Sequence, residues 1–200
     1  MTTNHTTRRR RWAEATALAA GITLTVVHVD HAAGDGWRAR VALRDTSGRR
    51  VGIVRFEGDD HGTEVRVTLA GVTSGLDAYH GLHIHAGDAS ATCDGTTTPP
   101  FTNVGGHWTM GAELHGHHDG DLPPVLVQAD GTGTASATTA RFQPGDLIGK
   151  AVVLHAGPDN LANVPTRYVT GEPPVAGPDA ATNATGDAGS RIACGVITGD

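Results

Sequence analysis

The chain has 200 residues, enough for one domain with a sizeable hydrophobic core. Its 28 glycines and few aromatic residues argue against a mainly helical protein. The formal net charge is −6, and residues 34–200 alone carry −8 because residues 1–33 have a surplus of +2. This acidic body gives no reason to expect nucleic acid or an anionic membrane as a partner, and no apolar run is long enough to span a bilayer.

Residues 1–33 form a basic and then apolar segment ahead of the predicted domain at 34–200. Arg8, Arg9, Arg10 and Arg11 precede an apolar stretch at 12–29 that is rich in Ala, Leu and Val, as in an export signal. Glu14 interrupts the apolar stretch, and no small-x-small cleavage site follows at the right distance. We predict export to the periplasm, cell envelope or extracellular space, with a cytoplasmic tail as the alternative.

Short alternating segments separated by turn residues follow along the chain. Alternation of apolar and polar residues is typical of strands with one buried face, and several such strands favour an antiparallel sandwich or barrel. We predict no helix of useful length after residue 33. The predicted strands are 37–43, 51–56, 65–69, 81–85, 125–128, 134–139 and 150–155.

Two long stretches, 86–122 and 156–189, lack strand character. Loops this long in a compact domain are usually functional or disordered. The first stretch contains most of a cluster of histidines, so we expect metal to hold it in place.

Two histidines stand two positions apart in the predicted strand at 81–85. On an extended backbone His83 and His85 point to the same face, while Leu82 and Ile84 point into a core. Alone, such a pair is more often ordinary surface or core chemistry. Neutral imidazole is a common ligand of copper and zinc, however, and further donors follow or adjoin the pair. They are His80, His107, His115, His117, His118, His155 and Asp121.

The chain has only two cysteines, Cys93 and Cys194, and no Cys-x-x-Cys motif. This excludes a structural zinc knuckle and a thioredoxin-type redox pair. The two residues are either buried thiols or a bridge that closes a loop of about 100 residues, worth roughly 4.7 kcal/mol in the chain-entropy model.

The segments 80–85 and 186–197, in this order and with these histidines and cysteines, make the chain resemble the copper–zinc superoxide dismutase family over roughly residues 36–198. The resemblance implies an all-β fold, a Greek-key eight-stranded β-barrel or immunoglobulin-like sandwich with two long functional loops. It also implies an oxidoreductase that disproportionates superoxide, its small-molecule substrate, to dioxygen and hydrogen peroxide. The reaction would occur at a copper site that a histidine bridges to zinc.

The resemblance also assigns roles to individual residues. The implied copper ligands are His83, His85, His107 and His155, with His107 as the bridge. The implied zinc ligands are His107, His115, His118 and Asp121. The loop between these zinc ligands is shorter than is usual in the family, so His117 competes with His118 for one position.

Outside the ligands, the resemblance makes Asp159 the carboxylate that orients ligand histidines of both metals, and Arg191 the active-site arginine. It implies a disulfide between Cys93 and Cys194. The interval from His155 to Arg191 is longer than in many relatives, so we expect the loop shape and subunit contacts to differ from theirs.

Another class of function is a superoxide dismutase-like domain that binds or buffers copper without turnover. Storage needs neither an anion-guiding Arg191 nor a bridge fixed through Asp159, so these two residues favour the enzyme. An inert structural sandwich is a weaker third interpretation. A homodimer is an open possibility for the assembly.

Overall fold

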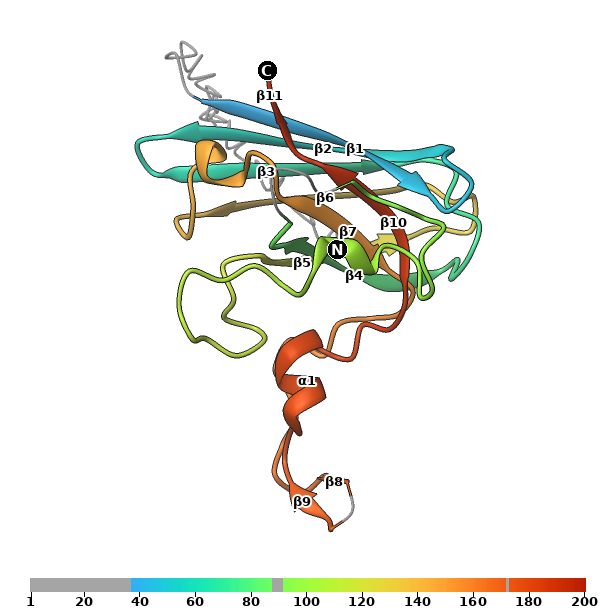
Figure 1. Cartoon of the computed structure of the whole chain (residues 1–200), viewed down its shortest axis with the longest axis vertical. Helices are drawn as coiled ribbons and strands as arrows, with labels where there is room; N and C mark the ends of the chain where they lie inside the picture. Colours follow the sequence, from blue (N-terminus) through green and yellow to red (C-terminus); the bar gives the residue numbers. More distant parts are fainter. Residues whose placement is uncertain (1–36, 88–91, 172) are drawn as a thin grey trace, which may run out of the picture. The chain divides into compact units, whose positions relative to one another are not determined.

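The structure is a computed structural model that describes residues 37–87, 92–171 and 173–200 (Figure 1). The predicted export segment at 1–33 lies outside these residues. Among the described residues, no helix is long and apolar enough to cross a membrane.

The described part of the chain is mainly β-structure with three short helical elements. The helical elements are η1 (Thr102–Val104), η2 (Pro144–Leu147) and α1 (Ala180–Thr185). The strands are β1 (Arg38–Asp45), β2 (Arg50–Asp59), β3 (Gly62–Leu69), β4 (Ala78–His85), β5 (Asp121–Val127), β6 (Gly133–Thr139), β7 (Ala151–His155), β8 (Val169–Thr170), β9 (Val175–Ala176), β10 (Arg191–Val196) and β11 (Thr198–Gly199).

The main sheet has the order β5-β4-β7-β10-β1-β2-β3-β6, and its strands pair antiparallel. The short β11 pairs with β1. The end strands β5 and β6 follow each other in the chain through a tight turn and contact each other, so the sheet nearly closes. The connections from β3 to β4 and from β6 to β7 cross over other strands. This confirms the predicted all-β, eight-stranded Greek-key barrel.

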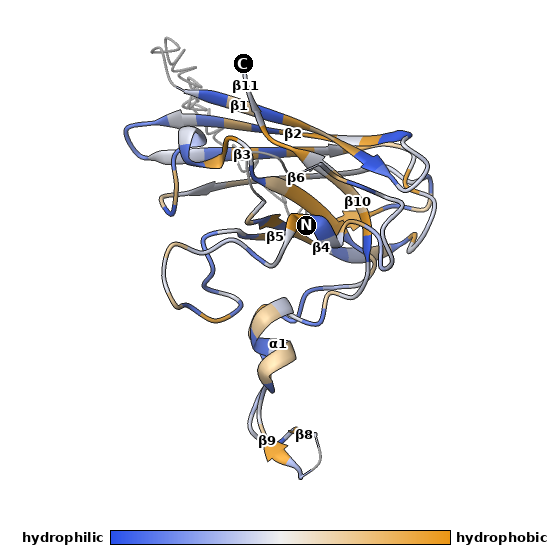
Figure 2. Ribbon diagram, viewed as in Figure 1, coloured by the Kyte–Doolittle hydropathy of each residue, from blue (hydrophilic) through white to orange (hydrophobic). Residues whose placement is uncertain are grey.

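The barrel core follows from the predicted alternation. In β1 the buried residues are Ala39, Val41 and Leu43, with exposed residues between them, and Figure 2 shows mixed polar and apolar bands along β1 and β2. Burying each large apolar side chain stabilises the fold by roughly 1.5–3 kcal/mol. Leu82 and Ile84 of β4 lie in this core, as predicted, so His83 and His85 face outward.

The predicted boundary between the first loop and β5 was wrong. The loop was expected to run to residue 122 and the strand to begin at 125, but β5 begins at Asp121. Pro123 and Pro124 lie inside β5, and proline normally argues against a strand because it has no N–H to donate. Here β5 ends the hydrogen-bonded order of the sheet, where a missing donor is tolerated.

The second loop has more regular structure than the sequence predicted. Within 156–189 lie the two-residue strands β8 and β9, which pair with each other, and the six-residue helix α1. In Figure 1 the β8–β9 hairpin lies at the far end of this loop from the main sheet. Such short elements leave little periodic signal. Asp179 caps α1 by accepting a hydrogen bond from the Thr182 N–H at 2.8 Å.

A disulfide joins Cys93 of the first loop to Cys194 of β10. The described cysteines therefore include no free thiol. Around this bridge a second apolar cluster covers the outer face of the sheet, with Phe101 and Val104 of the loop packed near Val153 of β7. The first loop is thus held on the barrel by a covalent bond and by burial.

Opening this disulfide should lower the free energy of unfolding by up to about 4.7 kcal/mol, because the bridge closes a loop of about 100 residues. Denaturant unfolding with and without reductant measures this loss. Thiol titration of the denatured, unreduced protein should find almost no free thiol. Two titratable thiols in protein recovered from its native compartment would contradict the bridge, and would count against export as well.

Candidate metal centre

The strand register brings the two loops together beside β4. In the β4–β5 pair His83 lies opposite Asp121, and in the β10–β7 pair Arg191 lies opposite His155. His107, from the first loop, forms an isolated β-bridge with His85. This hydrogen-bonded pairing therefore brings residues far apart in the sequence to one outer surface of the barrel.

Four histidines form the first donor group: His83, His85, His107 and His155. One ring nitrogen from each lies within 4.8 Å of the others, and the Nε2 atoms of His85 and His155 are 3.3 Å apart. The Nδ1 atoms of His85 and His155 lie 2.9 Å from Gly105 O and 3.0 Å from Gly189 O. When each Nδ1–H group donates a hydrogen bond to its carbonyl, the Nε2 atom of the same ring keeps its lone pair free to bind a metal. Four imidazole nitrogens suit copper.

The second donor group surrounds one oxygen of Asp121. The Nδ1 atom of His107 lies 3.0 Å from Asp121 Oδ1, and the Nδ1 atoms of His115 and His118 each lie 3.3 Å from it. A tetrahedral zinc ion with bonds of about 2.0–2.1 Å would hold its ligand atoms about 3.3 Å apart. The spacing around this carboxylate therefore fits zinc.

Asp121 is fixed by the backbone as well as by the histidines. Its Oδ2 atom accepts hydrogen bonds from the N–H groups of Gly116 at 2.7 Å and His118 at 3.0 Å. Oδ1 is thereby left to face the imidazoles. Ligand atoms of His83, His107, His115 and Asp121 all lie within 4.8 Å of one another, and His118 is not part of this cluster.

Three buried ring nitrogens have no hydrogen-bond partner among the described residues: His83 Nδ1, His107 Nε2 and His115 Nδ1. A buried polar atom without a partner costs roughly 1–3 kcal/mol, so these atoms call for a ligand. His83 and His107 belong to both clusters of metal-binding atoms, and His115 belongs to the second. Such unpartnered nitrogens are expected where metal ions occupy two adjacent sites.

Asp159 connects the two groups. Its Oδ2 atom lies 2.6 Å from His83 Nε2 and its Oδ1 atom lies 2.7 Å from His115 Nε2. The carboxylate side chain is 1% exposed. Because it accepts from one nitrogen of each ring, it directs the other nitrogen of each ring toward a metal position.

Burial favours the neutral form of three imidazoles of the first group, those of His85, His107 and His155. It lowers the pKa of His107 to about 4, against the opposing hydrogen bond to Asp121, and burial together with the neighbouring His83 lowers the pKa of His155 to about 3. Burial and the neighbouring His107 hold the pKa of His85 well below its usual value. The neutral imidazole is the form that binds a metal.

The carboxylates at the second group favour a positive charge beside them. Burial opposes the charged form of His115, but Asp121 and Asp159 outweigh it and raise the pKa of this residue to about 9. Burial also disfavours both carboxylates, yet hydrogen bonds from the histidines hold the pKa values of Asp121 and Asp159 far below the usual range. A proton on His115 or a metal ion among the ring nitrogens can supply the positive charge.

Arg191 lies half-buried beside the first group. Its guanidinium donates to Phe101 O at 2.5 Å and to Gly105 O at 2.6 Å, both in the first loop. Burial lowers its pKa, but an arginine stays charged at any physiological pH. The disulfide-anchored loop thus holds one fixed positive charge at this site.

Two clustered histidines join neither group. His80 is buried, with Nδ1 2.6 Å from His155 O and Nε2 2.7 Å from Gly75 O, and His117 is exposed. One residue that the sequence reasoning missed is Arg141, whose Nη1 donates to His118 O and Asp121 O. No spacing motif marks it, because it bonds to backbone carbonyls.

Exchange of His118 for alanine should weaken zinc binding by more than tenfold, whereas His117→Ala should have little effect. The reason is that His118 is buried with its ring facing Asp121, and its neighbour points to solvent. Competition titration with a chelator measures both affinities. Equal losses would show that the two residues can exchange as ligands, and the reverse order would refute the assignment of His118.

The outer face of this antiparallel barrel carries a four-imidazole group and an imidazole–carboxylate group that overlap at His83 and His107. This arrangement defines a protein that can bind two metal ions side by side. Comparison with known proteins identifies the family. A family model for copper/zinc superoxide dismutase matches residues 50–197. This chain therefore belongs to the copper/zinc superoxide dismutase family.

Individual relatives agree. A superoxide dismutase [Cu-Zn] of Mycolicibacterium paratuberculosis is 35% identical over 164 residues, which cover 78% of this chain and 71% of that protein. The superoxide dismutase [Cu-Zn] of Mycobacterium tuberculosis is 36% identical over 168 residues, which cover 78% of this chain and 68% of that protein. Superoxide dismutase [Cu-Zn] 2 of Brassica juncea is 34% identical over 167 residues, which cover 78% of this chain and 95% of that protein. The family and the two donor groups establish an oxidoreductase with copper and zinc as cofactors and superoxide as substrate, in preference to a copper-buffering domain.

Proposed function

We propose that this chain disproportionates superoxide with His83, His85, His107 and His155 as copper ligands, and His107, His115, His118 and Asp121 as zinc ligands. One observation carries the proposal. His107 places Nδ1 3.0 Å from Asp121 Oδ1, while its Nε2 atom is buried without a partner in contact with the other rings. A single imidazole is therefore positioned to join both sites.

Copper held by the first ligand set would supply the one-electron redox chemistry, and zinc held by the second ligand set would help to fix the His107 ring. One superoxide anion loses its extra electron and leaves as dioxygen. The second gains that electron and two protons and leaves as hydrogen peroxide. His107 Nε2 holds one of these protons at the site, and water provides the other.

The remaining residues bind and orient. Arg191 attracts the anion, because its guanidinium is fixed against two carbonyl oxygens and no described carboxylate pairs with it. A local positive charge is needed, since residues 34–200 carry −8 and repel an anion on average. Asp159 keeps the His83 and His115 rings in the orientation that both sites require.

Metal analysis of the purified full chain beside a superoxide dismutation assay tests this function. We expect about one copper and one zinc per chain, and turnover that disappears when copper is withdrawn. Withdrawal of zinc should mainly loosen the first loop and lower stability, because structural metal binding contributes directly to folding. Protein that holds copper at these histidines without dismutating superoxide would contradict the proposal and favour copper buffering.

The proposal also covers export of the chain and its assembly as a homodimer. Export is supported by the Cys93–Cys194 disulfide, because such bonds persist in oxidising compartments. Cell fractionation decides between export and the cytoplasm. Sedimentation velocity of the metal-loaded chain tests the homodimer predicted as one possible assembly.

A further inference from the structure

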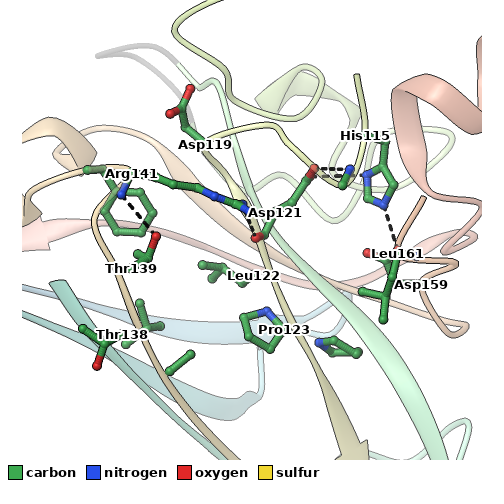
Figure 3. Close-up of a pocket in the computed structure, with 15 residues that line it drawn as sticks. His115, Asp119, Asp121, Leu122, Pro123, Thr138, Thr139, Arg141, Asp159 and Leu161 are labelled. Carbon is green, nitrogen blue, oxygen red and sulfur yellow. Dashed lines mark hydrogen bonds and ion pairs between the residues drawn. The ribbon is translucent and has the colours of Figure 1, made fainter. Parts of the chain in front are cut away.

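A cavity of about 350 Å³ opens beside the zinc group, between β5, β6 and the two long loops (Figure 3). Its apolar lining includes Leu122, Pro123 and Phe142. The opposite wall is polar and includes two of the proposed zinc ligands, His115 and Asp121. This cavity therefore reaches the zinc group from a side that does not pass the copper ligands His85 and His155.

The charges along the cavity suit a cation. Asp119, Asp121 and Asp159 all line it, against the single guanidinium of Arg141. His115, whose Nδ1 atom lies 3.3 Å from Asp121 Oδ1, is on the same wall. A divalent cation in the cavity would lie beside carboxylates and an imidazole, which are groups that bind zinc.

Arg141 closes the zinc-binding turn on this side. Its Nη1 atom donates to His118 O at 3.0 Å and to Asp121 O at 3.1 Å, the two ends of a turn that also has the Asp121 N–H bonded to His118 O. Both residues are proposed zinc ligands. A charged donor bonded to both carbonyls holds the ligands at a fixed separation.

The guanidinium has no competing partner. No carboxylate in the described ranges lies within ion-pair distance of Arg141, although Asp119 lines the same cavity. The Arg141 backbone N–H is held by Thr139 Oγ1 at 3.2 Å, so the side chain extends from a fixed point at the end of β6. Within the described chain, the hydrogen bonds of this guanidinium are both with the zinc-binding turn.

We propose that zinc reaches and leaves its ligands through this cavity, and that Arg141 is the positioning residue that keeps the His118–Asp121 turn closed around the ion. The proposal rests on the zinc ligands assigned above. Arg141 governs how long zinc stays, and the width of the cavity governs how fast zinc moves in both directions.

Zinc release to an excess of a chromophoric chelator, from the full chain loaded with copper and zinc, tests the positioning role. Release should be roughly tenfold to hundredfold faster in Arg141→Ala, the size expected for loss of hydrogen bonds from a charged donor. Copper release should not change. Arg66→Ala is the matched control, because Arg66 is an exposed arginine of β3 that pairs with Glu64 and does not touch either loop.

Chemical rescue separates positioning from a general loss of structure. Millimolar guanidinium should slow zinc release in Arg141→Ala and leave the wild-type rate unchanged, because the free ion can occupy the vacated space. Arg141→Lys should be intermediate, since an ammonium has a different reach and geometry. Unchanged zinc release in Arg141→Ala, or equal acceleration of copper and zinc release, would overturn the role of Arg141.

Leu161→Gly tests the route itself. Leu161 lines the cavity, is exposed, and has a φ of 54°, a conformation that suits glycine. Its N–H bond to Asp159 is made by the backbone and is kept. We expect zinc uptake and release to accelerate together by several-fold, with the equilibrium zinc affinity unchanged.

The results of these experiments distinguish a failure of the proposed zinc route from a failure of the proposed enzyme function. Unchanged uptake and release in Leu161→Gly, in a chain that binds zinc and dismutates superoxide, would refute the route alone. A wild-type chain that binds no zinc when zinc is supplied would refute the assigned zinc ligands, and the route with them.

Discussion

Asp159→Asn should lower zinc affinity and superoxide dismutation by about 10–100-fold, the usual cost of losing a residue that orients metal ligands. Both carboxylate oxygens are in use, one at 2.6 Å from His83 Nε2 and the other at 2.7 Å from His115 Nε2. Asparagine keeps the size but replaces one oxygen with an NH₂ group, which cannot accept from a ring N–H. One of the two imidazoles then loses the partner that sets its orientation.

Metal content after dialysis and kcat/KM of the reloaded enzyme measure this loss. Asp187→Asn is the matched control, because Asp187 lies in the same loop and accepts from Thr182 Oγ1 and Asn160 Nδ2 instead of from a histidine. Full metal content and activity in Asp159→Asn would show that the histidines are oriented without this carboxylate.

Arg191→Ala should lower kcat/KM by roughly tenfold to hundredfold. A guanidinium about 6 Å from an approaching anion is worth about 2.8 kcal/mol at an effective dielectric constant of ~20, and solvent and salt reduce this value. Each ~1.4 kcal/mol corresponds to one decade in rate. Arg191→Lys should retain much more activity, because charge matters more than the planar fork for a small anion, although lysine cannot keep both carbonyl contacts.

Ionic strength provides the second measurement. The wild-type rate should fall as salt increases, and the rate of the alanine variant should fall less. Arg167→Ala removes the same charge from the second loop, where Arg167 lies over the ring of Tyr168, and should have little effect. Full activity and an unchanged salt dependence in Arg191→Ala would show that Arg191 is an ordinary surface charge.

The barrel was largely predictable because a strand with one buried face records its environment every second residue. The pattern located β1 to β4, β6 and β7 within a few residues of their observed bounds. It missed the start of β5, because Pro123 and Pro124 argue against a strand unless the strand is known to lie at the end of the sheet order. Sheet order is a property of pairing between distant segments, and periodicity carries no information about it.

The candidate site was predictable in part. The alternation in β4 placed His83 and His85 on one face, and the family resemblance added the other histidines, Asp159 and the disulfide. Arg141 was not found by either argument. It lies 20 residues after Asp121 and acts through backbone carbonyls, which every residue has, so no residue type or spacing indicates the contact.

The all-β class, the outward direction of His83 and His85, and the residues able to bind copper and zinc could be inferred from the sequence, because side-chain direction and donor chemistry depend on near neighbours in the chain. The folded structure was needed to show that His83 lies opposite Asp121, that Arg191 lies opposite His155, and that Arg141 closes the zinc-binding turn. These contacts join residues that are between 23 and 38 positions apart in the chain. They depend on strand register and loop closure, which are set by the cooperative burial and hydrogen bonding of the whole barrel.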